Sequence, residues 1–205
     1  MSLTFFYSPH STAVATHWVL EEIGVPYEKV RVDLKSRDQD KPEFRALNPN
    51  GKVPVLVHDG TPIFESAAIA LYLGELYGDK NRVYPEPGPR RGEAMKWIVW
   101  TNVSVAASLA MYMEVQGDHA PAEQHNEKLA AKAKGETEQL FGILDAHLAT
   151  RTWLVGDQFT IADAHLASFV GYAGMIGFDI KRFKNVDAWL ARGTKRPGFA
   201  VSMQP

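Results

Sequence analysis

A proline at the start of an apolar run is the first feature of this sequence that could do chemistry. Residues 48–56 read NPNGKVPVL, and the second half has the composition of a buried strand. Proline lacks a backbone N–H, so sheets tolerate it at strand starts, edges and bulges. If the Val53–Pro54 bond is cis, the N–H and C=O of Val53 would face outwards and could pair with an extended peptide ligand. If the bond is trans, Pro54 simply opens an ordinary strand.

A carboxylate and a hydroxyl follow about ten residues later. Glu65 and Ser66 interrupt the apolar segment IFESAAIALYL, where a strand is expected to give way to a helix. The N–H and hydroxyl of Ser66, at the positive end of that helix, would suit an α-carboxylate, and Glu65 could pair with an ammonium group. Together with Val53, they predict a ligand that carries both groups on one carbon and continues as a peptide. The alternative is that Ser66 only caps the helix.

The composition argues against several other chemistries. The 205 residues include no cysteine, which excludes disulfides, thiolate metal sites and a protein thiol nucleophile. The formal net charge is -2 with no basic block, so we expect no nucleic-acid partner. His119 and His125 lie six residues apart and cannot share one helix face, so we expect no metal site. We find no signal-peptide pattern and no run of roughly 18 apolar residues, and we expect a cytoplasmic protein without a membrane span.

The first 80 residues have the pattern of a small α/β domain. A strand, a helix and an alternating strand are expected over 3–7, 12–23 and 27–34, with Gly24 ending the helix. Two further strands meet at Asp59-Gly60, a hairpin turn signal, and a helix runs from Ser66 to about Gly78. The order β-α-β and then β-β-α predicts a thioredoxin-like module.

The rest of the chain reads as all-helical. Residues 81–89 are rich in proline and predict a stiff linker, and a second domain follows over 90–205. Apolar residues spaced three and four apart predict helices over 95–112, 129–148, 161–175 and 186–192. The expected fold class is therefore α/β plus all-α, with a thioredoxin-like domain (βαβ-ββα) before a helical one.

Four motifs in this order resemble the cytosolic glutathione S-transferases. They are YSPHST, NPNGKVPVL, FESAAIALYL and FTIADAHL, and the resemblance extends to the closing VDAWLARGTKRPGF. The chain is similar to bacterial-type members whose active site uses a serine or threonine hydroxyl rather than a cysteine. The resemblance implies glutathione as co-substrate, no metal and a homodimer. In FTIAD, Thr160 and Asp163 are expected to form a capping box with Phe159 as a hydrophobic staple.

The resemblance also implies roles for the residues in these motifs. Val53, before Pro54, would pair its backbone with the cysteinyl group of glutathione. Glu65 and Ser66 would hold the γ-glutamyl end, and Lys52 would lie near the glycyl or γ-glutamyl carboxylate. Ala67 stands where many members have arginine. This departure removes one positive charge from the pocket but leaves the pocket itself.

The first helix would activate the glutathione thiol. That thiol is only a few per cent ionised at neutral pH, and lowering its pKa by about 2 units requires roughly 2.7 kcal/mol. A hydrogen bond to an ionised group contributes about 1.5–3 kcal/mol, and a helix N-terminus about 0.3–1 kcal/mol. One hydroxyl is therefore sufficient, and Ser11 and Thr12 are both placed for it. Motif similarity favours Ser11, which is our choice from the sequence, the spacing to LEEIG favours Thr12 as the second candidate, and Tyr7 is a third.

The second substrate would lie between the domains. His10 either borders this acceptor pocket or is a solvated loop residue, and Met111 and Tyr112 either line an apolar cleft or belong to the core. We expect a transferase that conjugates glutathione to a small hydrophobic electrophile, as in detoxification. The alternatives are a non-catalytic binding module of the same fold, or a glutathione-dependent isomerase or dehalogenase.

Overall fold

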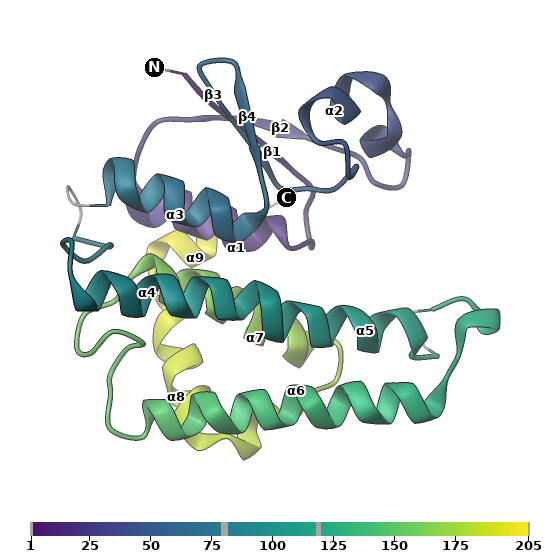
Figure 1. Cartoon of the computed structure of the whole chain (residues 1–205), viewed down its shortest axis with the longest axis vertical. Coiled ribbons are helices and arrows are strands. Elements are labelled where there is room, and N and C mark those ends of the chain that lie inside the picture. The colour runs from purple at the N-terminus through teal and green to yellow at the C-terminus, as the bar shows by residue number, and fades with distance from the viewer. Residues whose placement is uncertain (1, 79–81, 118–119, 205) are drawn as a thin grey trace.

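The computed structural model describes residues 2–78, 82–117 and 120–204 and contains a sheet domain stacked on a helical domain (Figure 1). The strands are β1 (Leu3–Tyr7), β2 (Glu28–Arg31), β3 (Val55–His58) and β4 (Thr61–Phe64). They form a four-stranded sheet in the order β2-β1-β3-β4, in which β1 runs parallel to β2 and antiparallel to β3. The predicted thioredoxin-like topology is confirmed.

The hairpin between β3 and β4 turns where the sequence predicts. Asp59 and Gly60 both have positive φ, 47° and 83°, as a two-residue turn between antiparallel strands requires. The strand predicted over 27–34 is shorter than expected, because its residues leave the sheet after Arg31. Val32 instead turns inwards and is buried with Phe44 and Val55 in a small second core cluster.

Two long helices and one short helix complete this domain. Helices α1 (Ala13–Ile23) and α3 (Ser66–Tyr77) form where they were predicted, and they pack against each other beside the sheet (Figure 1). Helix α2 (Pro42–Leu47) was not predicted. It is one and a half turns long with proline in its first turn, and its only buried residue is Phe44. Such a short element carries no recognisable helical periodicity.

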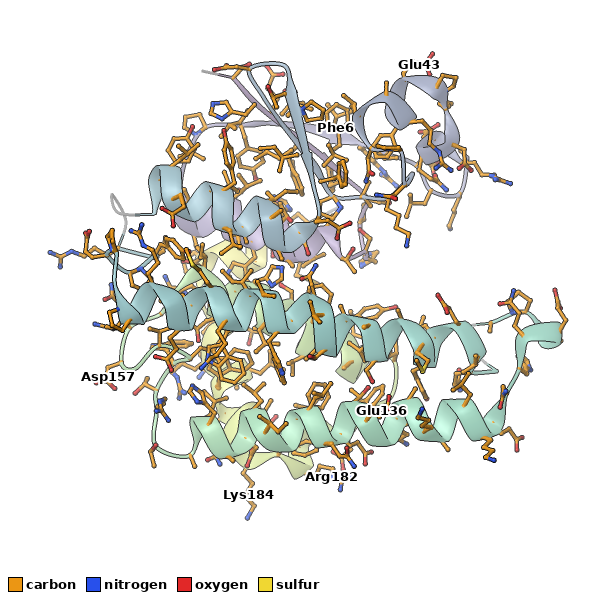
Figure 2. The ribbon with its side chains drawn as sticks, in the orientation of Figure 1. Phe6, Glu43, Glu136, Asp157, Arg182 and Lys184 are labelled. Carbon is orange, nitrogen blue, oxygen red and sulfur yellow. The ribbon has the colours of Figure 1, made fainter. Side chains whose placement is uncertain are left out.

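The helical domain contains α4 (Pro89–Trp100), α5 (Ala107–Val115), α6 (Glu127–Leu148), α7 (Ile161–Met175), α8 (Lys184–Gly193) and α9 (Pro197–Ser202). A π-helical stretch over Thr101–Ala106 joins α4 and α5 into one rod. Length and composition alone would let this rod, Pro89–Val115, cross a membrane, but core helices of soluble proteins pass the same test. Here α4 packs on α7 and α5 on α6, and charged side chains such as Asp157 and Lys184 project from the outer surface (Figure 2).

The start of α7 is built as predicted. Thr160 and Asp163 form the capping box, and the buried Asp163 carboxylate also accepts hydrogen bonds from the Leu154 N–H and the Trp189 indole. Phe159 packs against Trp18 and Trp153. Because Trp18 belongs to α1, Phe159 joins the two domains in addition to any local role as a staple.

A partly buried ion pair fastens the C-terminal segment to the first domain. Arg196 donates two hydrogen bonds to the Glu22 carboxylate, at 2.9 and 2.6 Å, and its guanidinium lies 3.9 Å from the ring centroid of Phe159. Helix α9 thereby lies against α1. The predicted division into 1–80, 81–89 and 90–205 remains a prediction, and residues 80 and 81 lie outside the described part of the chain.

Candidate functional site

The Val53–Pro54 peptide bond is cis in this structure. The ladder between β3 and its neighbours begins at Val55, so the N–H and C=O of Val53 lie outside it. Val53 is half-buried, and its C=O is 3.4 Å from the hydroxyl of Thr12. A backbone edge that could pair with a peptide therefore lies directly beside the start of α1.

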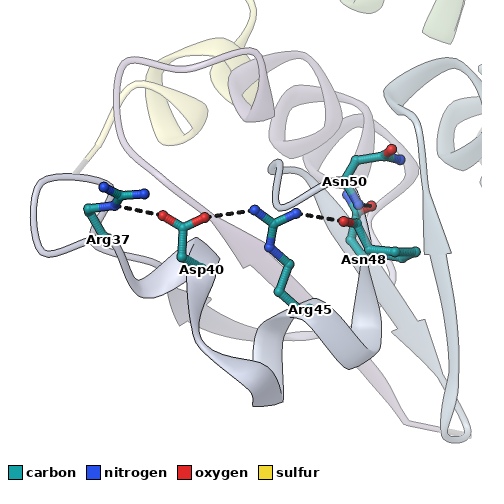
Figure 3. A network of polar contacts seen from close by, with 6 residues as sticks. Arg37, Asp40, Arg45, Asn48 and Asn50 are labelled. Atoms are coloured by element: carbon teal, nitrogen blue, oxygen red, sulfur yellow. Dashed lines mark hydrogen bonds and ion pairs between the residues drawn. The ribbon is translucent and has the colours of Figure 1, made fainter.

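A polar network fixes the loop that leads into this edge (Figure 3). Asp40 accepts hydrogen bonds from Arg37 at 2.7 Å and from Arg45 at 2.8 Å, and Arg45 also donates to the Pro49 C=O at 2.6 Å. These hydrogen bonds from two guanidinium groups lower the pKa of Asp40. The network ties the turn after α2 to the segment before it.

The last residues of the loop are held by Asn48. Its buried amide donates to the Lys52 C=O at 2.7 Å and accepts from the Asn50 N–H at 3.0 Å. Gly51 has φ 63°, and a Cβ there would lie 2.6 Å from the guanidinium carbon of Arg45. The backbone of Lys52 is thus fixed while its ammonium group stays exposed.

The two candidate hydroxyls at α1 have different surroundings. The Ser11 hydroxyl donates to the Ser8 C=O at 2.7 Å and accepts from the Ala13 N–H at 3.2 Å, so it closes its own turn. The Thr12 side chain is exposed, and its hydrogen bond to the Val53 C=O is long at 3.4 Å. His10, just before them, is exposed and has φ 56°, a conformation that non-glycine residues rarely adopt.

The second predicted binding pair lies at the start of α3. Glu65 is exposed and has φ 71°, another rare backbone conformation of the kind that clusters at ligand sites. Ser66 is 5% exposed, and its hydroxyl lies 3.1 Å from the Asn102 amide nitrogen and 3.2 Å from Nε2 of His165. Both of these partners belong to the helical domain.

A cleft of about 500 Å³ lies between the domains at the N-terminus of α1. The structure brings five predicted residues together in its wall: His10, Ser11, Thr12, Lys52 and Val53. From the helical domain, the lining includes Ala106, Leu109, Ala110, Met113, Phe169 and Tyr172. Sequence periodicity did not distinguish these residues from core residues.

The predicted acceptor residues Met111 and Tyr112 are not in this lining. Met111 is 37% exposed, and Tyr112 packs edge-on against Phe178 at 5.0 Å between ring centroids. The reason is the rotation of α5, which turns Met113 rather than its two neighbours towards the cleft. Glu65 and Ser66 are likewise not in the lining, and they lie at the start of α3.

A second, apolar cavity of about 200 Å³ adjoins the cleft. It lies among α1, α7, α8 and α9 and shares with the cleft His10, Ser11, Thr12, Phe169 and Tyr172. Burial raises the pKa of Tyr172, so the phenol keeps its proton at neutral pH. The cleft and the cavity therefore meet at the candidate hydroxyls of Ser11 and Thr12. In the described ranges, no three His, Asp or Glu side chains are grouped to hold a metal ion.

Comparisons with known proteins identify the family of the chain. Residues 1–75 match the model of the glutathione S-transferase N-terminal domain, and residues 103–197 match that of the C-terminal domain. The chain is 33% identical to the glutathione S-transferase GstB of Escherichia coli over 180 residues, which are 87% of this chain and 86% of that protein.

Solved structures match over the full fold. One is a glutathione transferase from Burkholderia graminis with two glutathione molecules bound per subunit. It is 30% identical to this chain, with a TM-score of 0.86, and the match covers 98% of this chain and 87% of that chain. The URE2P8 transferase of Phanerochaete chrysosporium, with oxidized glutathione, has 27% identity and a TM-score of 0.88 and covers 98% and 93%. This chain belongs to the glutathione S-transferase family.

Proposed function

We propose that this protein binds glutathione in the cleft between its domains and conjugates the thiol to a small apolar electrophile. The observation that carries the proposal is the backbone edge of Val53, which lies outside the sheet ladder and beside the Thr12 hydroxyl at the start of α1. Family membership and the glutathione-bound relatives support the choice of ligand. The division into a glutathione-binding domain and an acceptor-binding helical domain is part of the same proposal.

The peptide part of glutathione would lie along residues 52–54. The Val53 N–H and C=O would pair with the cysteinyl residue in antiparallel fashion, as an added strand pairs with a sheet edge. The Lys52 ammonium would attract a carboxylate of the tripeptide. The γ-glutamyl end would reach Glu65 and Ser66, where the start of α3 supplies a hydroxyl and N–H groups with positive potential.

We now prefer Thr12 to Ser11, the choice from the sequence, as the group that stabilises the thiolate. A ligand cysteine paired with Val53 brings its sulfur close to Thr12, whose hydroxyl already lies 3.4 Å from the Val53 C=O. Ser11, in contrast, would have to give up a 2.7 Å hydrogen bond to Ser8 before it could donate to sulfur. We assign Ser11 the role of shaping the turn that presents Thr12.

The apolar cavity that adjoins the cleft would receive the acceptor. Because it meets the cleft at Thr12, a hydrophobic electrophile there would lie next to the glutathione sulfur. Catalysis would then come from thiolate formation and proximity. Burial of Tyr172 keeps a neutral hydroxyl at the junction, able to donate to a polar atom of the acceptor.

We also propose a homodimer. Leu76 on α3, Val99 on α4 and Val103 in the π-helical stretch are large apolar residues left 46%, 44% and 70% exposed. Large apolar residues at such exposure on neighbouring elements suit burial by a second subunit.

A second candidate reaction is the reduction of a disulfide by two glutathione molecules, suggested by the relative that holds two per subunit. One glutathione thiolate would attack the disulfide and release a thiol. The second thiolate would attack the resulting mixed disulfide, releasing the other thiol and glutathione disulfide. This route needs no protein cysteine, which the chain lacks.

Product analysis tests the proposal. Purified protein is incubated with glutathione and either a small aromatic halide or a low-molecular-weight disulfide, and the products are identified by mass spectrometry. We expect a thioether conjugate from the halide, with kcat about 10- to 100-fold lower in Thr12→Ala because a hydrogen bond to an ionised group is lost. Glutathione binding without a conjugate from any apolar halide would contradict the transferase assignment, and glutathione disulfide from the second substrate would favour the alternative reaction.

A further inference from the structure

The hydroxyl of Ser66 is held by two side chains of the other domain. The Asn102 amide nitrogen lies 3.1 Å from Ser66 Oγ, and His165 Nε2 lies 3.2 Å from the same atom. His165 is fully buried in α7, and Asn102 is half-buried in the π-helical stretch that interrupts the α4–α5 rod. Such stretches often mark functional positions in helices. The two contacts link α3 to both α7 and the rod.

The direction of each hydrogen bond follows from what the partners can do. For Asn102, donation by the amide nitrogen at 3.1 Å is better than the reverse bond to its oxygen at 3.4 Å. His165 Nδ1 is buried and has no partner among the described residues. A proton on Nδ1 would be an orphaned buried donor, whereas a proton on Nε2 leaves only an unpaired acceptor, which is less unfavourable. His165 therefore donates through Nε2.

Burial keeps this arrangement constant with pH. It lowers the pKa of His165 from 6.5 to about 3, so the ring is neutral throughout the working range. A neutral ring places no positive charge in the core and holds one fixed N–H against Ser66.

The Ser66 hydroxyl accepts hydrogen bonds from Asn102 and His165, and this determines what its own O–H can do. A serine hydroxyl has two acceptor lone pairs and one O–H. With both lone pairs accepting from Asn102 and His165, the O–H is left for a third acceptor, because its contact with the Asn102 Oδ1 is long at 3.4 Å and would replace the shorter bond from the same amide. The Ser66 N–H, as the first of α3, has no acceptor within its helix. Both donors of Ser66 are therefore available to an anion at the start of α3.

We propose that His165 and Asn102 are positioning residues that aim the Ser66 hydroxyl at the α-carboxylate of the γ-glutamyl group. The inference rests on the proposed glutathione site and assigns the helical domain a part in it. If the two contacts only joined the domains, removing them would affect the binding of ligands with and without the α-carboxylate equally.

The test compares two ligands by calorimetry: glutathione, and the analogue that lacks the α-carboxylate of its γ-glutamyl residue. The variants are His165→Phe, which keeps an aromatic ring beside Phe169 without the donor, and Asn102→Leu. We expect each variant to bind glutathione about 5- to 30-fold more weakly, which is part of the effect of losing one hydrogen bond to a charged group. We expect the affinity for the analogue to change less than about twofold.

Two further variants make the result specific. His165→Gln retains an N–H that can reach Ser66, and we expect it to restore most of the glutathione affinity. His147→Phe removes another half-buried histidine of the same domain, which contacts the Leu154 C=O, and should bind both ligands as the wild type does. If His165→Phe does not fold by circular dichroism, Asn102→Leu alone decides the question, since its side chain is only half-buried.

Each outcome bears on a different claim. Unchanged glutathione affinity in the folded variants, or equal weakening of glutathione and the analogue, would overturn the positioning role and leave the proposed function intact. A wild-type protein that binds neither ligand would overturn the proposed function and this inference with it. Selective loss of glutathione affinity would establish the positioning role.

Discussion

Burial of His165 predicts that the protein loses stability in mild acid. The folded-state pKa of this residue is lowered to about 3 by desolvation, whereas the ordinary value of 6.5 applies to the unfolded chain. Between these two values the unfolded state binds a proton that the folded state does not. The free energy of unfolding contributed by His165 is therefore fully present above pH 6.5 and is lost progressively as the pH falls towards 3.

The size of the effect follows from the shift. Each pH unit below 6.5 removes about 1.4 kcal/mol for one such residue, so the loss between pH 7 and pH 5 is about 2 kcal/mol. That is a large part of the 5–15 kcal/mol typical of a folded domain. His17 and His147 also have pKa values lowered by burial, so the wild-type loss exceeds the part due to His165.

Comparison of variants isolates the contribution of His165 to the pH dependence of stability. Urea unfolding is followed by tryptophan fluorescence at pH 7, 6 and 5 for the wild type, His165→Gln and the exposed-histidine control His125→Gln. We expect the control to lose as much free energy of unfolding as the wild type between pH 7 and pH 5. We expect His165→Gln to lose about 2 kcal/mol less than the wild type over the same interval. Equal pH dependence in all three proteins would refute the reasoning, because it would mean that His165 titrates alike in both states.

Two further substitutions test how the domains and the loop are held. Arg196→Ala removes two guanidinium hydrogen bonds from the Glu22 carboxylate, whose side chain is 6% exposed. We expect the free energy of unfolding, measured by urea titration, to fall by about 3 kcal/mol. A change below about 0.5 kcal/mol would show that the ion pair contributes little to stability. Gly51→Ala places a side chain at φ 63° against Arg45. We expect it to lower the free energy of unfolding by about 1 kcal/mol and to weaken glutathione binding in calorimetry. Unchanged stability and unchanged affinity would contradict this expectation.

Local sequence patterns predicted the elements whose structure depends on neighbouring residues. The Asp59-Gly60 turn, the capping box of Thr160 and Asp163, and the bounds of α7 all follow from interactions within a few positions along the chain. The thioredoxin-like order of strands and helices followed in the same way. Helices α2 and α9, each six residues long, have too few turns to produce a periodic signal.

The candidate site was predictable only in part, because its walls are assembled across the sequence. The motif order identified the residues from His10 to Thr12 and from Lys52 to Val53 that line the cleft. The side of α5 that faces the cleft depends on how the π-helical stretch rotates the rod, and no sequence pattern indicated that stretch. Asn102 and His165 lie in helices that contain other polar residues, so no pattern singled them out, and their common partner Ser66 appears only in three dimensions.

Ionisation of bound glutathione tests the central claim most directly. The protein is saturated with glutathione, and thiolate absorbance is followed from pH 5 to pH 9 in the wild type, Thr12→Ala and Ser11→Ala. The account predicts a bound-thiol pKa about 2 units below the free value in the wild type, a return towards the free value in Thr12→Ala, and a smaller change in Ser11→Ala. A bound thiol with the pKa of free glutathione in the wild type would contradict thiolate activation at the start of α1.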